Sequence, residues 1–190
     1  IFHFHPTIPR IVCQTIRIQN FLFLKASNFL FFNTIIIIAE LIIYFGKSMK
    51  LVVMKFGGTS VADIDKIKNV ADIVQKELNN YKIIVVLSAM AGETNKMQKY
   101  IDDIKSDEKI ENDLILTAGE NVTIGILSAI LKKRNIKSIP LLGWQLPIIT
   151  DINHQKAKII NIDKKRVYNY LNSYDVMVVA GFQGVDLNGH

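Results

Sequence analysis

Residues 51–60 read Leu-Val-Val-Met-Lys-Phe-Gly-Gly-Thr-Ser, and this stretch decides the class of fold. A short apolar run that ends in a pair of glycines is typical of a buried strand entering a turn. Thr59 and Ser60 are residue types that begin helices, and Ser60 with Asp63 approximates a capping box. The stretch therefore predicts a strand, a glycine turn and a helix that starts close to Ser60.

The same alternation of strand and helix continues along the chain. Apolar positions follow helical spacing up to residue 78, and a second apolar run, at 83–87, predicts another buried strand. Near-continuous apolar strands alternating with helices indicate an α/β fold, with a mainly parallel sheet covered by helices on both faces. The other predicted elements are helices through 97–101, 112–133 and 163–171, strands at 138–142 and 175–180, and an edge strand at 147–150.

Two glycines interrupt the long helical pattern of residues 112–133. Gly119 and Gly125 would each destabilise a helix by about 1 kcal/mol relative to alanine. We expect either a close approach of another backbone or a break in the helix at these positions.

Composition limits the functional classes. A chain of 190 residues has room for one domain, or one domain with an attachment. Its 49% hydrophobic and 21% charged residues exclude intrinsic disorder, and its single cysteine, Cys13, excludes an intramolecular disulfide and a cysteine-only zinc site. The net charge is +6, but residues 49–190 carry only +3 of it and show no basic stripe. This distribution does not favour nucleic-acid binding.

The first 48 residues differ from the rest. The segment holds a 17-residue apolar run from Phe29 to Phe45. That length is close to the lower limit for a membrane-spanning helix, and Glu40 inside it would be costly in lipid. Three interpretations stay open: a membrane anchor or uncleaved signal, an organellar transit segment, or translated sequence upstream of a start at Met49. We expect residues 1–48 to lie outside the native fold.

The residues suited to phosphate chemistry follow the first predicted strand. In open α/β sheets, ligands bind beyond the carboxyl ends of the strands. Gly57 and Gly58 let backbone N–H groups approach an anion, a following helix N-terminus would add a positive dipole end, and Lys55 could place a positive charge on the same phosphate. The alternative is a glycine turn with a solvated lysine. The Walker and Rossmann phosphate motifs are both absent.

Two further segments carry candidate binding groups. The loop 88–95, Ser-Ala-Met-Ala-Gly-Glu-Thr-Asn, offers hydroxyl and amide donors after a buried strand, although Thr94 could simply cap a helix. Glu120 lies within an apolar helical pattern, where a carboxylate needs a partner or a shifted pKa. A substrate ammonium would serve, and so would a structural lysine. His154 and the nearby Asp151 would provide only two metal ligands, which is too few, so we interpret His154 as a loop histidine.

Four motifs occur here in the order and approximate spacing found in aspartate kinases. They are Lys-Phe-Gly-Gly-Thr-Ser (55–60), Ser-Ala-Met-Ala-Gly-Glu-Thr-Asn (88–95), Leu-Thr-Ala-Gly-Glu (116–120) and Val-Ala-Gly-Phe-Gln-Gly (179–184). From Met49 onward the chain resembles the N-terminal portion of the kinase domain of that family. Residues 49–190 would then be the first part of a three-layer amino-acid kinase fold, truncated at its C-terminal side.

The resemblance implies ATP-dependent phosphorylation of the β-carboxylate of L-aspartate, which gives 4-phospho-L-aspartate for lysine, threonine and methionine synthesis. It implies that Lys55 contacts the transferring phosphoryl group and that Gly57, Gly58 and Ser60 line the ATP site. Thr94 and Glu120 match the family's aspartate-binding residues. ATP and Mg²⁺ are the expected cofactors, and no metal ligand of the protein is assigned.

The resemblance also implies a cytoplasmic enzyme that is a homo-oligomer at full length. We expect no kinase activity from residues 1–190 alone, because the family's later glycine-rich segment, its nucleotide-base pocket and its regulatory domains have no counterpart here. Two alternatives remain: a non-catalytic binding protein or membrane-attached remnant of the kinase fold, and another member of the amino-acid kinase superfamily.

Overall fold

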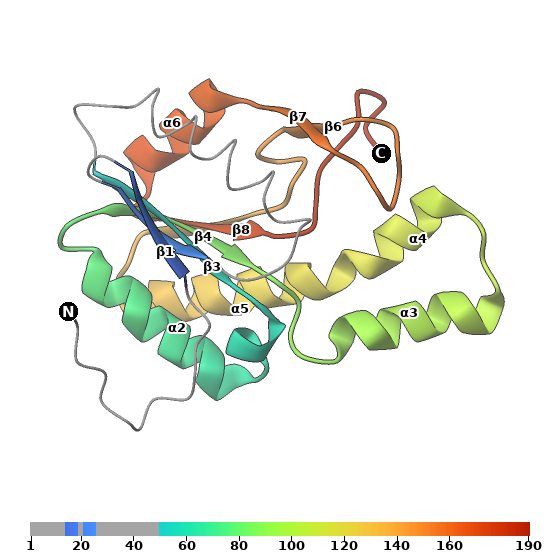
Figure 1. Cartoon of the computed structure of the whole chain (residues 1–190). Helices are drawn as coiled ribbons and strands as arrows, with labels where there is room; N and C mark the ends of the chain where they lie inside the picture. Colours follow the sequence, from blue (N-terminus) through green and yellow to red (C-terminus); the bar gives the residue numbers. More distant parts are fainter. Residues whose placement is uncertain (1–13, 19–20, 26–49) are drawn as a thin grey trace.

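The computed structural model describes residues 14–18, 21–25 and 50–190 (Figure 1). Its main sheet has the strand order β1-β2-β3-β4-β8-β5, and every neighbouring pair except β1 and β2 is parallel. The α/β class with a mainly parallel sheet is therefore confirmed. The strands are β1 (Gln14–Ile18), β2 (Phe21–Lys25), β3 (Leu51–Phe56), β4 (Lys82–Leu87), β5 (Ser138–Leu141) and β8 (Val176–Ala180).

Helices cover both faces of this sheet. The helices α2 (Ile64–Glu77) and α5 (Ala118–Lys133) lie on one face, and α6 (Lys164–Ser173) lies on the other (Figure 1). Because successive strand side chains point to opposite faces, β3 contributes Met54 and Phe56 to the core under α2 and α5, and Leu51 and Val53 to the core under α6. The three layers predicted from the alternating pattern are confirmed.

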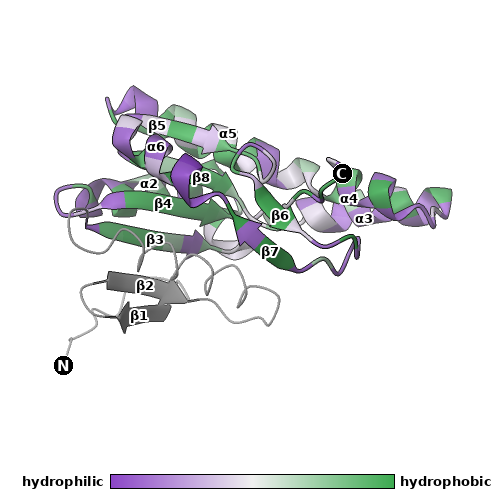
Figure 2. Ribbon diagram, turned by 90° about the horizontal axis from the view of Figure 1, so that it is seen from above, coloured by the Kyte–Doolittle hydropathy of each residue, from purple (hydrophilic) through white to green (hydrophobic). Residues whose placement is uncertain are grey.

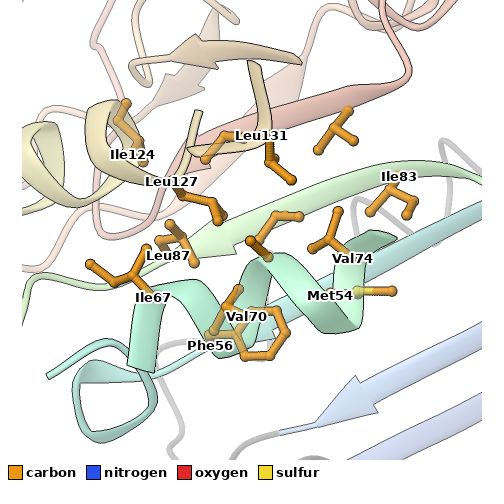
Figure 3. Close-up of a cluster of buried hydrophobic side chains, with 14 of the residues drawn as sticks. Met54, Phe56, Ile67, Val70, Val74, Ile83, Leu87, Ile124, Leu127 and Leu131 are labelled. Carbon is orange, nitrogen blue, oxygen red and sulfur yellow. The ribbon is translucent and has the colours of Figure 1, made fainter. Parts of the chain in front are cut away.

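The larger core lies between the sheet and the pair α2 and α5. Figure 3 shows side chains from α2 and α5 meeting those of β3 and β4. The central strands β4 and β8 are apolar on both faces, and Figure 2 shows the same predominance of hydrophobic residues along them. Fully buried strands of this kind explain why the strand segments lack alternation in the sequence.

The predicted start of the first helix is wrong. Gly58–Val61 forms a four-residue 3-10 turn, η2, and α2 begins only at Ile64. Asp63 is the N-cap, because its side chain accepts a hydrogen bond from the Lys66 backbone N–H at 2.8 Å. Asp63 has a side-chain oxygen that reaches this donor, so it takes the capping role that the sequence suggested for Ser60.

The long helical pattern of residues 112–133 is divided in two. Helix α4 (Lys109–Leu116) is followed by a single turn residue, Thr117, and α5 starts at Ala118. Gly119 makes the close approach that we expected, because a Cβ atom there would lie 2.6 Å from the Ala89 Cβ. Gly125 makes no such approach, because it is exposed and a Cβ atom there would meet none of the described residues within 4 Å.

A long two-helix arm precedes α5. Helix α3 (Glu93–Ile104) and α4 extend together away from the sheet (Figure 1). Taken together, residues 109–133 are long and apolar enough to span a membrane by length and composition. However, α5 contributes Ile124, Leu127 and Leu131 to the core, which is the behaviour of a core helix in a globular domain.

A small second sheet pairs β6 (Ile148–Thr150) with β7 (Ile159–Ile162). The edge strand predicted at 147–150 is confirmed, whereas β7 was not predicted from the sequence. A single bridge joins Ile149 to Val185, so the hairpin also contacts the segment that follows β8.

The N-terminal segment is described only at β1 and β2, whose backbones extend the sheet beyond β3. The apolar run at 29–45 lies outside the described residues. That residues 1–48 do not belong to the native fold stays a prediction.

Candidate functional site

Three parallel strands end at the same level of the sheet. Phe56 is paired with Leu87, and Leu87 is paired with Ala180. The segments 57–60, 88–95 and 181–184 therefore leave the sheet side by side at its carboxyl edge. This is the arrangement in which open α/β sheets bind ligands.

Lys55 lies one residue before this edge. It points to the same face as Leu51 and Val53, away from α2 and α5. Its side chain is partly buried, and this burial lowers its pKa from 10.5 to about 8. Lys55 therefore remains mainly protonated at neutral pH and can place a positive charge beside a bound anion.

The glycine turn after β3 has one tight position and one open one. A Cβ atom on Gly58 would lie 3.1 Å from the Ala89 carbonyl oxygen, whereas one on Gly57 would meet nothing within 4 Å. Ser60, partly buried in η2, donates its backbone N–H to the Gly57 carbonyl at 2.8 Å. We expected a helix N-terminus, with its positive dipole end, directly after the glycines. This prediction is wrong, because η2 has only four residues and α2 begins only at Ile64. The groups that this segment itself offers to an anion are therefore its local N–H groups and Lys55.

Glu120 enters the site from the first turn of α5. Its side chain is only 4% exposed, and its Oε1 accepts a hydrogen bond from the Ala89 backbone N–H at 3.0 Å. Burial raises the pKa of Glu120, and the Ala89 N–H partly opposes that shift. The second oxygen, Oε2, has no hydrogen-bond partner in the part of the chain that the structure describes. A buried carboxylate oxygen without a partner can accept a bond from a ligand's ammonium group.

The close approach of α5 depends on Gly119. The small size of this residue allows the α5 N-terminus to contact Ala89, and Ala89 in turn contacts Gly58. Gly58, Ala89 and Glu120 therefore form one continuous contact across the ends of β3 and β4. The structure thus brings together two of the predicted site residues, Gly58 and Glu120.

Thr94 lies farther from this contact. It is exposed and is the second residue of α3. Thr94 therefore lies inside the helix and does not cap it; the N-cap is Gly92, with φ +85°. The preceding residue, Glu93, is beside Gly119, since a Cβ atom there would lie 3.6 Å from the Glu93 Cβ. Thr94 is therefore near the N-terminus of α5, and the residue is exposed.

Gln183 is a polar group at this edge whose role was not predicted. Its Oε1 accepts a bond from the Gly143 N–H at 3.2 Å, while its Nε2 donates to the Thr117 carbonyl at 3.1 Å and to Asn121 Oδ1 at 2.8 Å. It thereby connects the end of β8 to the loop after β5 and to the start of α5. The motif Gly-Phe-Gln-Gly contained the signal, but it was interpreted only as a turn of close backbone approach.

That backbone approach is confirmed at Gly181. A Cβ atom there would lie 2.8 Å from the Leu87 carbonyl oxygen, which accepts the Gly181 N–H at the same 2.8 Å. No side chain fits between β8 and β4 at this point.

His154 lies in the loop between β6 and β7, as expected, and it does not pair with Asp151. Asp151 instead accepts backbone N–H bonds from Asn153 and Lys158 within its own loop. His154 Nδ1 lies 3.1 Å from Asp113 Oδ2, on α4. The loop that carries His154 thus contacts an element about 40 residues earlier in the chain.

The chain belongs to the amino acid kinase family, whose sequence model matches residues 50–190. It is 43% identical over 143 residues to an aspartokinase of Rickettsia felis, covering 73% of this chain and 36% of that protein. It is 44% identical over 144 residues to an aspartate kinase of Pseudomonas putida, covering 74% and 35%. The chain therefore spans about a third of the length of these curated relatives.

Solved structures agree on the fold. An aspartate kinase from Synechocystis superposes with a TM-score of 0.62 at 32% identity, covering 70% of this chain and 22% of that one. E. coli aspartokinase III, in complex with aspartate and ADP, superposes with a TM-score of 0.60 at 22% identity, covering 74% and 42%. The resemblance to aspartate kinases and the amino-acid kinase-like fold class are confirmed.

Proposed function

We propose that this chain provides the N-terminal part of an aspartate kinase catalytic domain. The reaction is ATP-dependent phosphorylation of the L-aspartate β-carboxylate, giving 4-phospho-L-aspartate and ADP. The curated relatives above, at 43% and 44% identity, are named aspartokinase and aspartate kinase, which supports this proposal. The E. coli enzyme of the same fold was solved with aspartate and ADP.

The burial and bonding of Glu120 are the observation that carries the proposal. A carboxylate that is 4% exposed needs compensation, and its Oε1 receives the Ala89 N–H. Oε2, which has no hydrogen-bond partner among the described residues, matches the amino group of an amino-acid substrate, whose positive charge would favour the ionised form of Glu120. We therefore assign Glu120 to the α-ammonium of aspartate, with the exposed residue Thr94 as a second substrate contact.

We assign Lys55 and the glycine turn to the phosphate-binding site. Phosphoryl transfer depends mainly on positioning and on neutralising charge. Lys55 would bind the transferring phosphoryl group, and the backbone at Gly57, Gly58 and Ser60 would contact the ATP phosphates. In the reaction, a β-carboxylate oxygen of aspartate forms a bond to the γ-phosphorus while the bond to the ADP oxygen breaks.

Mg²⁺ is expected to arrive with ATP. The phosphate-site residues are one lysine, two glycines and one serine, and they include no carboxylate. They do not form a magnesium site of their own, so no step is assigned to the ion. We also infer from the family resemblance that the complete enzyme is cytoplasmic, is a homo-oligomer and feeds lysine, threonine and methionine synthesis.

A chimera tests the proposal, because the matched region is only about a third of its relatives. Residues 50–190 replace the matching segment of the Rickettsia felis aspartokinase, and aspartate-dependent ADP release is measured. We expect activity with aspartate, none with glutamate, and a rise in the aspartate KM for Glu120→Gln.

Lys55→Ala in this chimera should abolish turnover without unfolding the protein. Lys50→Ala is the matched control, because Lys50 is an exposed lysine just before the same strand. A folded chimera without aspartate-dependent turnover, or one that keeps its turnover in Lys55→Ala, would contradict the proposal.

A further inference from the structure

Two histidines and a buried aspartate meet where the loop between β6 and β7 contacts the last residues of the chain. The ligand atoms of His154, Asp186 and His190 all lie within 4.8 Å of one another. The shortest separations are 3.9 Å from His154 Nε2 to Asp186 Oδ2, and 3.8 Å from His190 Nδ1 to the same oxygen. Figures 1 and 2 both place the C-terminal end beside α4 and the β6–β7 hairpin.

The orientation of His154 is set by a second carboxylate. Its Nδ1 lies 3.1 Å from Asp113 Oδ2, which also accepts the Gln155 backbone N–H at 3.1 Å. Because an ionised carboxylate only accepts hydrogen bonds, this contact favours the tautomer with its proton on Nδ1, in which Nε2 is available as a metal ligand. Histidines that bind metals usually have such a carboxylate partner on the other ring nitrogen.

Asp186 is also oriented in advance. It is 4% exposed, and its Oδ1 accepts the backbone N–H groups of Asn188 at 2.8 Å and His190 at 2.9 Å. The turn is closed by a bond from the Asp186 N–H to the His190 carbonyl at 2.8 Å. These bonds hold Oδ1 against the backbone and leave Oδ2 between the two imidazoles, apart from a 3.3 Å contact with Asn188 Nδ2.

We propose that His154, Asp186 and His190 form a site for a divalent transition metal, with Zn²⁺ as the best fit. Two imidazoles and one carboxylate, with a fourth position open to water, are a frequent zinc ligand set. Bonds of about 2.0–2.2 Å place tetrahedral ligand atoms about 3.3–3.6 Å apart, so the two short separations need to close only slightly. His190 is exposed and can rotate to close the longest one.

The metal would act as a clamp between distant segments. It would join the loop 151–158 to the turn 186–190, which directly follows the Gly181–Gly184 segment at the carboxyl edge of the sheet. This proposal is independent of the kinase assignment, because none of its ligands belongs to the proposed aspartate or ATP site. The expected consequence is slower proteolysis of both segments in the presence of zinc.

The test measures zinc binding by the full chain, which is first freed of metal by chelation and dialysis. Calorimetry detects the binding of Zn²⁺, and absorption spectroscopy detects the binding of Co²⁺ as a probe. We expect one site per chain and a cobalt band typical of low coordination number. His154→Gln and His190→Gln should each weaken zinc binding by more than about 100-fold, and Asp113→Asn by about 10- to 100-fold. His190 is exposed, so its replacement should leave the fold intact, as checked by circular dichroism.

The chain offers a matched control. Its other two histidines, His3 and His5, and its single cysteine, Cys13, are the remaining histidine and cysteine side chains that could bind zinc. The triple variant His3→Gln/His5→Gln/Cys13→Ser should bind zinc like the wild type. The proposal is overturned if this variant loses the site, or if folded His154→Gln and His190→Gln proteins keep wild-type affinity.

Discussion

Gly119 and Gly125 are two glycines of the same helix whose replacement by alanine should have opposite effects on stability. A Cβ atom at Gly119 would lie 2.6 Å from the Ala89 Cβ, which real Cβ atoms essentially never do. A Cβ atom at Gly125 would meet nothing within 4 Å. Gly125 lies in the interior of α5 and Gly119 in its first turn, so Gly125→Ala sets an upper limit for the gain in helix propensity at Gly119.

The magnitude follows from these contacts. Overpacking a well-packed site costs about 1–3 kcal/mol, and the Ala89 Cβ cannot rotate away because it is fixed to the backbone. The helix must move, which also stretches the buried bond from the Ala89 N–H to Glu120. The gain in helix propensity, at most about 1 kcal/mol, offsets part of this cost. We expect Gly119→Ala to lower the free energy of unfolding by about 2 kcal/mol, within the range for overpacked sites, and Gly125→Ala to raise it by about 0.5–1 kcal/mol.

Urea unfolding of the full chain, followed by circular dichroism, measures both values by linear extrapolation. Gly125→Ala is the control for propensity, and unchanged m-values would show that the denatured state is comparable. If Gly119→Ala were as stable as the wild type, the close approach of α5 to Ala89 would not exist as described.

Two further predictions concern Glu120 and Gln183. Burial raises the folded pKa of Glu120, so the wild type loses stability as pH rises above about 4.5, the unfolded value. The variant Glu120→Gln keeps an acceptor for the Ala89 N–H but cannot ionise. Its free energy of unfolding relative to the wild type should therefore increase from pH 4 to pH 8, as measured by urea titrations. A difference that does not change with pH would refute this. Gln183→Leu leaves the Gly143 N–H and the Thr117 carbonyl without their side-chain partner. It should cost about 1–3 kcal/mol of unfolding free energy, more than Gln145→Leu, which removes a single bond to the Leu142 N–H. Equal losses would contradict the idea that the several bonds of Gln183 hold these segments together.

Much of the fold could be predicted from local sequence. The apolar runs at 51–56, 83–87 and 176–180 are long enough and bounded clearly enough to identify buried strands, and their alternation with helical patterns predicted the parallel sheet. Helix boundaries were less certain, because Ser60 and Asp63 are both capping residues. Only the three-dimensional path of the turn decides which side chain reaches a free N–H.

The candidate site was predictable by residue type, but not by contact. Lys55, the glycine pair and Glu120 could be selected because charge and glycine stand out at the ends of apolar runs. The contact between Gly58, Ala89 and Glu120 could not, since it joins positions about 30 residues apart along the chain. The bonds of Gln183 across 40 to 66 residues were missed for the same reason.

The sequence by itself determined the alternation of strand and helix, and the residue types available at the strand ends. Periodicity and turn chemistry are local properties, so they can be identified along the chain. Only the tertiary structure decided that Glu120 is buried with one oxygen that no described residue bonds, that Gly119 is tightly packed while Gly125 is exposed, and that His154 meets Asp113 and Asp186. Burial and pairing depend on which distant segments pack together, and that packing is established only when the whole sheet and its helices assemble.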